Sequence, residues 1–236
     1  MENIIELIRE ELKRIADIKI KSAQEKFFKE PVRFLGIRNH NVHKISSFYF
    51  RKLTDKSKNA VFCLCEILWQ SDFMEEKFIA CDWSYRVKKE YIPGDFDIFE
   101  RWVNNYVNNW ATCDTLCNHS VGTLIEKYPE LIQCLKKWAL SENRWMRRAA
   151  AVSLIIPGRK GLFIKDIFEI AEILLLDTDD MVQKGYGWML KAASEFHLKD
   201  VYEFVITRKS TMPRTAYRYA IEKMPSEMKK VAMKKY

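Results

Sequence analysis

Apolar residues recur every three to four positions along most of the chain, which is the spacing of one face of an α-helix. Three stripes illustrate the pattern: Ile4, Ile5, Ile8, Leu12 and Ile15; Val61, Leu64, Cys65 and Leu68; Leu131, Leu135 and Trp138. No stretch shows the alternation of apolar and polar residues that marks a half-buried strand. The pattern therefore predicts an all-α chain of roughly a dozen helices.

Short polar segments separate these periodic stretches. They are LTDKSKN, YIPGDFD, KYPE, ALSEN, PGRKG, LDTDD and TRKSTMP. Asp, Ser, Asn or Pro stands where a helix is expected to begin, as in SENRWMRR, DTDDMVQK and PSEMKK, and these residue types are favoured at helix starts. Amphipathic helices joined by short turns are typical of antiparallel pairs that stack into an α-solenoid.

Aromatic and basic residues recur at intervals that resemble one helical pair. Trp110 is followed after 35 residues by Trp145, near Arg148, and after a further 43 residues by Trp188, near Lys191. HEAT-like units are about 40 to 47 residues long, so these gaps fall within that range or just below it. No low-complexity linker divides the chain. We expect one HEAT-like repeat domain over residues 1–236.

Composition agrees with a helical, globular protein. The 236 residues are 48% apolar, which is enough for a substantial core, and contain only seven Gly and six Pro, little material for the tight turns of many strands. The N-terminus lacks the apolar core of a signal peptide, and the longest apolar runs are too short to span a bilayer. We expect a soluble, cytoplasmic, nucleoid-associated protein with no membrane partner.

A formal net charge of +8 favours an anionic partner such as nucleic acid, although a basic surface without any partner fits the charge as well. The six cysteines lie mostly within apolar helical patterns and lack the spacing of metal ligands, so we interpret them as buried reduced thiols.

One segment holds two residues that do not fit their surroundings. In NNWATCDTLCN, Trp110 and Asp114 are four residues apart, which places both on one face of a helix, and the neighbours of Asp114 are small or apolar. A tryptophan alone is best interpreted as core. A partly buried carboxylate must be paired, which makes Asp114 a candidate functional residue.

Six stretches in order along the chain resemble the DNA alkylation repair family, the AlkD-like HEAT-repeat DNA glycosylases. They are KFFKEPVRFLGIR, ILWQSDFMEEKFIACDW, NNWATCDTLC, ENRWMRRAAAV, DMVQKGYGWMLKAASE and MPRTAYRYAIEKM, and they span about Phe27 to Met224. The resemblance implies excision of cationic alkylated purines, such as N3-methyladenine and N7-methylguanine, from double-stranded DNA. We expect no cofactor and no metal.

The resemblance also implies roles for single residues. Asp114 matches the catalytic aspartate, and Trp110 and Trp188 match the two aromatic residues beside the sugar of the lesion. Arg148 matches the cationic residue at the DNA backbone. Ala111 departs from the pattern, because many members have an acidic residue directly after this Trp. The further DNA-binding candidates in the basic C-terminal half are Arg147, Lys184, Lys191, Arg214 and Arg218.

The chemistry of such a site follows from the substrate. Alkylation at N3 or N7 makes the purine cationic, so it leaves as a neutral base with little need for an acid. As the glycosidic bond lengthens, positive charge moves to the sugar, where a fixed carboxylate stabilises it and orients water. A Trp face adds cation–π stabilisation of about 0.5 to 2 kcal/mol.

Two functions remain open from the sequence. The first is a monofunctional alkylpurine DNA glycosylase, which we expect to be a monomer. The second is a non-catalytic HEAT-like module that binds DNA or serves as a protein scaffold. Trp110, Asp114, Arg148 and Trp188 together favour the enzyme, because a binding module has no reason to keep Asp114 on a basic surface.

Overall fold

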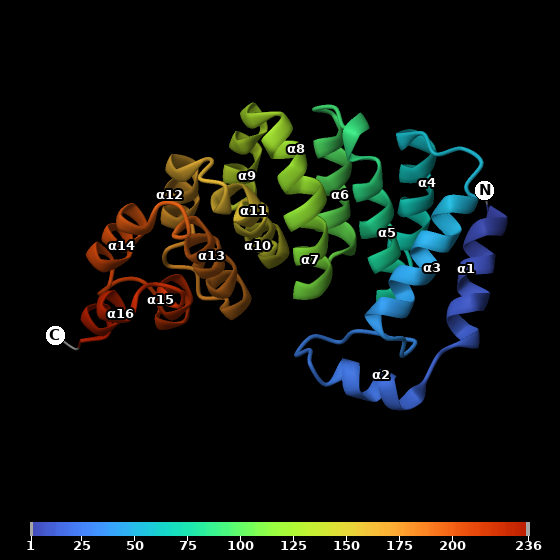
Figure 1. The fold of residues 1–236 in the computed structure, drawn as a ribbon, viewed down its shortest axis with the longest axis horizontal. Coiled ribbons are helices and arrows are strands. Elements are labelled where there is room, and N and C mark those ends of the chain that lie inside the picture. The colour runs from blue at the N-terminus through green and yellow to red at the C-terminus, as the bar shows by residue number, and fades with distance from the viewer. Residues whose placement is uncertain (1, 235–236) are drawn as a thin grey trace. The chain divides into compact units, whose positions relative to one another are not determined.

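The computed structural model describes residues 2–234, with side chains from residue 4 onward, and over this range the chain is helical without any strand. The nearest approach to a sheet within it is an isolated bridge between Arg33 and Phe73. The chain forms two compact units, Met1–Leu116 and Cys117–Tyr236, which are coloured blue to green and green to red in Figure 1.

The first unit consists of seven α-helices and a short 3₁₀ turn within its described residues. They are α1 (Glu2–Arg14), α2 (Ile18–Glu25), α3 (Asn39–Lys52), α4 (Lys58–Trp69), α5 (Met74–Arg86), η1 (Lys88–Glu90), α6 (Asp95–Tyr106) and α7 (Trp110–Leu116). Helix α5 packs on α3, α4 and α7. The predicted stripe of α1 is buried at Ile5, Ile8 and Leu12, so the apolar period does direct these residues into the core.

The core of the first unit is rich in aromatic rings. Phe62, Phe99 and Trp102 meet edge to face, with ring centroids 5.4 to 5.7 Å apart. Glu66 of α4 then accepts hydrogen bonds from Trp102 Nε1 and Tyr106 Oη, each at 2.6 Å. These contacts join α4 to α6. They also give the N–H of the buried Trp102 indole a hydrogen-bond partner at the edge of the core.

Acidification is expected to weaken the unit through Glu66. Burial acts to raise its pKa, but hydrogen bonds from Tyr106, Arg101 and Trp102 outweigh burial, and the pKa lies below its ordinary value. A carboxyl group whose pKa is lower in the folded than in the unfolded state stabilises the fold. This stabilisation is fully present above the unfolded pKa, about 4.3, and is lost as the pH falls through the folded pKa.

We therefore expect the free energy of unfolding of the wild type to fall between pH 6 and pH 3 by about 1 kcal/mol more than that of Glu66→Gln. Urea unfolding at both pH values measures this difference. Glu10→Gln, at an exposed position, is the control and should follow the wild type. Equal pH dependence in Glu66→Gln and the wild type would contradict the assignment.

The second unit begins with a π-helical turn, and its described residues continue as a series of short helices. They are η2 (Cys117–Val121), α8 (Gly122–Lys127), η3 (Pro129–Leu131), α9 (Ile132–Trp138), α10 (Arg144–Val152), α11 (Ile155–Arg159), α12 (Ile164–Ile173), α13 (Asp180–Ala193), α14 (Leu198–Thr207), α15 (Arg214–Ile221) and α16 (Ser226–Met233). Helix α13 is central and packs on α10, α11, α12 and α15. Asn143 and Asp179 cap α10 and α13 with their side chains, as the start signals predicted.

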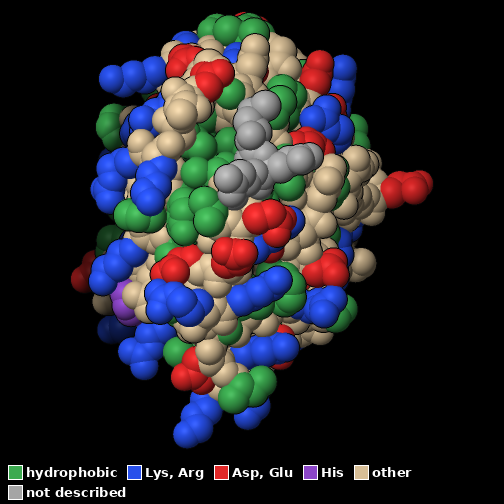
Figure 2. All heavy atoms as spheres, turned by 90° about the vertical axis from the view of Figure 1, so that its right-hand side faces the viewer, with side chains coloured by type: hydrophobic (Ala, Val, Ile, Leu, Met, Phe, Trp, Pro, Cys, Tyr) green, Lys and Arg blue, Asp and Glu red, His purple; other side chains and the backbone are tan. Residues whose placement is uncertain are grey.

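The surface of the first unit mixes charges of both signs. Figure 2 faces its N-terminal end, where Lys and Arg side chains alternate with Asp and Glu around a small area of hydrophobic side chains. Leu7 of α1 and Phe48 of α3 are 41% and 44% exposed. Charges of both signs are therefore present on this face.

Candidate active site and nucleic-acid interface

Helix α7 begins at Trp110 because Asn109 caps it. The side-chain oxygen of Asn109 accepts a hydrogen bond of 3.1 Å from the backbone N–H of Thr112, which is the contact expected of an N-cap residue. Asn109 is fully buried, and its amide nitrogen lies 3.3 Å from the sulfur of Met74. The cap fixes where the helix begins, and so places Trp110 on its first turn and Asp114 one turn later.

Trp110 is 36% exposed and its indole is held on one side by an aromatic residue from a distant part of the chain. The Phe28 ring stacks on it with centroids 5.3 Å apart and planes inclined by 14°. Ala111 next to it is buried in a cluster with Phe34 and Met74. An acidic side chain at position 111 would have to enter this apolar cluster, so burial favours an apolar residue at this position.

Asp114 is half-buried and lies on the same helix as Trp110. The prediction that the pair shares one helix is thereby confirmed. Next to Asp114, the Thr115 hydroxyl donates a 2.7 Å hydrogen bond to the carbonyl of Ala111, a contact that often bends helices. Two residues after Thr115 the α-helix gives way to the π-helix Cys117–Val121. Such π-turns are frequent at functional sites, and nothing in the sequence indicated this one.

In the second unit, Arg148 lies in the packed region between α10 and α13. It is 5% exposed, and its guanidinium donates a hydrogen bond to the backbone carbonyl of Met181. A Cβ at Gly185 would lie 3.2 Å from Arg148 Cγ, so the glycine provides room for this side chain. Trp188, half-buried, follows on α13 three residues after Gly185 and therefore on the same side of the helix. Arg148 and Trp188 thus belong to one pair of packed helices.

Several of the other predicted DNA-binding residues already have acidic partners. Arg147 Nε lies 2.6 Å from Asp177, and its guanidinium also donates to the carbonyls of Ser141 and Glu142. Lys184 pairs with Asp180 at 2.7 Å. Lys191 pairs with Glu222 at 2.9 Å and lies 5.4 Å from the ring centre of Tyr219.

Arg214 and Arg218 differ from these residues. Both are exposed on α15, four residues apart and so on one face of that helix. Among the residues that the structure describes, no carboxylate forms an ion pair with either of them. They are the two predicted contacts whose charge is most available to a phosphate.

Thiols lie close to α7 but are poor candidates for chemistry. Cys65, Cys81, Cys113 and Cys117 are buried, as expected, whereas Cys63 is exposed and Cys134 half-buried. Burial raises the pKa of the Cys65 and Cys81 thiols well above the ordinary value, which keeps them protonated and unreactive at neutral pH. Within residues 2–234, no three His, Cys, Asp or Glu side chains form a group suited to a metal ion.

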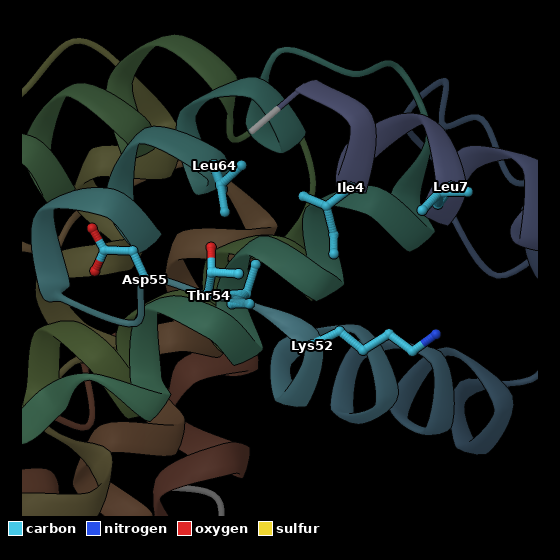
Figure 3. A pocket seen from close by; sticks show the side chains of 7 residues that line it. Ile4, Leu7, Lys52, Thr54, Asp55 and Leu64 are labelled. Atoms are coloured by element: carbon cyan, nitrogen blue, oxygen red, sulfur yellow. The ribbon is translucent and has the colours of Figure 1, made fainter.

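A cavity of about 230 Å³ in the first unit involves none of the predicted site residues. Figure 3 shows Ile4 and Leu7 of α1, Lys52 at the end of α3 and Leu64 of α4 around it. Thr54, Asp55 and Leu53 complete the lining. This cavity is therefore separate from the residues predicted to bind or act on DNA.

Comparison with known proteins identifies the family. Residues 8–224 match the model of the family described as DNA alkylation repair enzyme. The chain belongs to this DNA alkylation repair enzyme family. The predicted family is thus confirmed, and membership implies DNA as the substrate. No curated protein sequence matches the chain.

A solved structure supports the fold of this family member. The structure of a predicted DNA alkylation repair enzyme from Enterococcus faecalis superposes with a TM-score of 0.79 and 15% sequence identity. The match covers 89% of the present chain and 97% of that protein. The predicted fold class, all-α with HEAT-like helical repeats, is confirmed.

For this DNA alkylation repair family member, the residue roles themselves stay predictions. The structure brings Trp110 and Asp114 together on α7, and Arg148 and Trp188 on α10 and α13. Sequence reasoning missed Phe28 as a partner of Trp110 and missed Asn109 as the cap of α7. Asn is common directly before a helix, so the sequence did contain an indication of the cap, whereas it contained none of the stack between Phe28 and Trp110.

Among the described residues, no helix has both the length and the apolar character needed to cross a membrane.

Proposed function

We propose that the protein is a monofunctional DNA glycosylase that releases cationic N-alkylated purines, such as N3-methyladenine and N7-methylguanine, from double-stranded DNA. The observation that carries this proposal is the pair on α7: a half-buried carboxylate, Asp114, one helical turn from the partly exposed indole of Trp110. Family membership supports alkylated DNA as the substrate. Both groups attract positive charge, which is the charge that develops on the sugar in this reaction.

The proposed reaction is hydrolysis of the N-glycosidic bond. The bond between C1′ and the alkylated purine breaks, and its electron pair neutralises the positive charge on the departing base. The sugar becomes an oxocarbenium-like cation, which the Asp114 carboxylate stabilises by its charge. Water then adds to C1′ and gives its proton to the carboxylate or to solvent, leaving an abasic site and a neutral base.

Trp110 is proposed to face the sugar cation with its ring. A cation over a Trp face is stabilised by about 0.5 to 2 kcal/mol. For Trp188, half-buried on α13, we propose a second aromatic contact with the substrate, which rests on its match to the family motif. For Arg148, which is 5% exposed and donates a hydrogen bond to the carbonyl of Met181, the proposed role at the DNA backbone rests on its match to the family motif alone.

Release of free base tests the proposal directly. A duplex that contains N7-methylguanine is incubated with the purified protein without added metal or cofactor, and free base and abasic sites are counted. Equal amounts of both are expected, without strand cleavage. Tight binding to the duplex with no base release would instead support the non-catalytic DNA-binding module.

The two unpaired arginines of α15 are expected to determine part of the salt dependence of DNA binding. Each phosphate contact contributes about 0.9 to the slope of log K against log salt. The double variant Arg214→Ala/Arg218→Ala should lower the slope by roughly 1 to 2, for damaged and undamaged duplex alike. Fluorescence anisotropy between 50 and 200 mM salt, the range over which such binding weakens by about 10³ to 10⁵, measures the slope.

Arg147→Ala is the comparison for this measurement. Because Asp177 already neutralises Arg147, its removal should change the salt slope less and the stability of the second unit more. A slope that is unchanged in the α15 double variant would show that these two arginines do not contact phosphate.

A further inference from the structure

Phe28 covers one side of the indole that the proposed function places at the sugar. It comes from the segment between α2 and α3, and its ring lies nearly parallel to that of Trp110, with centroids 5.3 Å apart. Phe28 is half-buried, whereas its neighbour Phe27 is 79% exposed. Aromatic pairs prefer such offset stacking. The stack therefore restricts the rotation of Trp110 and leaves one face of it for another contact.

Phe28 is itself held by the core of the first unit. Its ring lies 5.6 Å from the ring of Phe34, at a tilt of 48°. Phe34 is buried with Met74 of α5 and Ala111 of α7. Because Ala111 is the residue after Trp110, the same apolar cluster supports both partners of the stack.

A buried carboxylate fixes the segment that carries Phe28. Glu75 of α5 is 1% exposed and accepts hydrogen bonds of 3.0 to 3.2 Å from the backbone N–H groups of Leu35, Gly36 and Ile37. Gly36 has φ of +97°, and a Cβ there would lie 2.1 Å from the carbonyl oxygen of Asp17. This position accepts only glycine, since other residues rarely adopt this φ and would clash.

We propose that Phe28 is a positioning residue, which holds the Trp110 indole in the orientation that presents its free face to the deoxyribose of the damaged nucleotide. The proposal rests on the proposed glycosylase function for its effect on rate. Its structural part, that the ring of Phe28 sets the orientation of Trp110, stands independently of that function.

Single-turnover release of N7-methylguanine measures the effect on rate. Phe28→Ala and Phe28→Leu should both slow release by about threefold to tenfold, which corresponds to the strength of an aromatic stack. Phe28→Tyr keeps the ring and should retain the wild-type rate. If Phe28 only fills space in the apolar cluster, Phe28→Leu will behave as the wild type, and the proposal is then wrong.

A double-mutant cycle shows whether Phe28 acts through Trp110. In a protein that already carries Trp110→Ala, Phe28→Ala should cause no further loss of rate, because there is no indole left to position. Losses that add in the double variant would overturn the proposal, since Phe28 would then act on the substrate or the fold by itself.

A measurement without DNA separates this proposal from the function. The seven tryptophans are replaced by 5-fluorotryptophan, and the ¹⁹F signal of Trp110 is assigned by its loss in Trp110→Phe. Phe28→Ala and Phe28→Leu should shift this signal, because the stacked ring is removed. Val32→Ala, which trims a side chain packed on the same cluster, should not.

Base release tests the proposed function, and the ¹⁹F signal of Trp110 tests the positioning role of Phe28. If the wild type releases no base, the proposed function is wrong, but the fluorine signal still tests whether Phe28 orients Trp110. If the wild type is active and the Trp110 signal is the same with and without the Phe28 ring, the positioning role is wrong and the function stands.

Discussion

Asp114→Asn is expected to slow release of N7-methylguanine about a hundredfold to a thousandfold, the cost of losing one preorganised electrostatic contact, about 2.7 to 4 kcal/mol. The substitution keeps the shape of the side chain and removes its charge. The carboxylate is half-buried on α7 beside Trp110, where its charge is less screened than in water. Single-turnover kinetics with excess protein measure the chemical step.

Binding of Asp114→Asn to the duplex is expected to stay the same or to tighten, because a carboxylate close to phosphates repels them. Asp97→Asn, at an exposed position of α6 in the same unit, is the matched control and should leave both rate and affinity unchanged. Melting temperatures of both variants show whether they are folded.

Two outcomes would remove the catalytic assignment. One is base release near the wild-type rate in a folded Asp114→Asn protein. The other is a loss of activity that only follows a loss of stability, which is the pattern of an aspartate that pairs within the fold. A large loss of rate at unchanged melting temperature and affinity would support the assignment.

Glu75→Ala is expected to destabilise the first unit by about 3 kcal/mol or more. The Glu75 carboxylate satisfies three backbone N–H groups of the segment before α3, and each buried donor left without a partner costs about 1 to 3 kcal/mol. Urea unfolding measures the loss. Hydrogen exchange of residues 33–38 should accelerate strongly, since this carboxylate holds the segment.

Glu25→Ala is the control for Glu75→Ala. The Glu25 carboxylate accepts one hydrogen bond, 3.3 Å from Phe34 N, and is half-exposed, so its removal should cost less than about 1 kcal/mol. Equal losses in the two variants would show that Glu75 does not anchor the segment. Because the segment carries Phe28, Glu75→Ala should also shift the fluorine signal of Trp110.

Much of the candidate site follows from local sequence. The spacing of Trp110 and Asp114 places them on one helical face wherever that helix packs, and Asn109 marks where the helix begins. The apolar stripe at Ile5, Ile8 and Leu12 likewise indicates which side of α1 is buried. The stripe and the spacing of Trp110 and Asp114 follow the period of the helix, and Asn is a common residue at helix starts, so local sequence indicates all three features.

The ion pairs of the basic residues in the C-terminal half are less predictable from the sequence. Arg147, Lys184 and Lys191 look equivalent to Arg214 and Arg218 as basic residues of the C-terminal half, yet the first three are paired with acidic residues. Lys184 has its partner one turn away, whereas Arg147 and Lys191 have partners from other segments. The pairing of Arg147 and Lys191 depends on which segments pack together, and no local sequence pattern indicates this.

The sequence alone thus determined the all-helical fold class, the family and the placement of Trp110 and Asp114, because each of these rests on helical period or on ordered motifs. Only the tertiary structure decided that Phe28 stacks on Trp110, that Glu75 fixes the Phe28 segment, and that Arg148 is buried between α10 and α13. The physical reason is that these contacts join residues far apart in the chain. Their partners are selected by packing and burial, and not by the spacing of neighbouring residues.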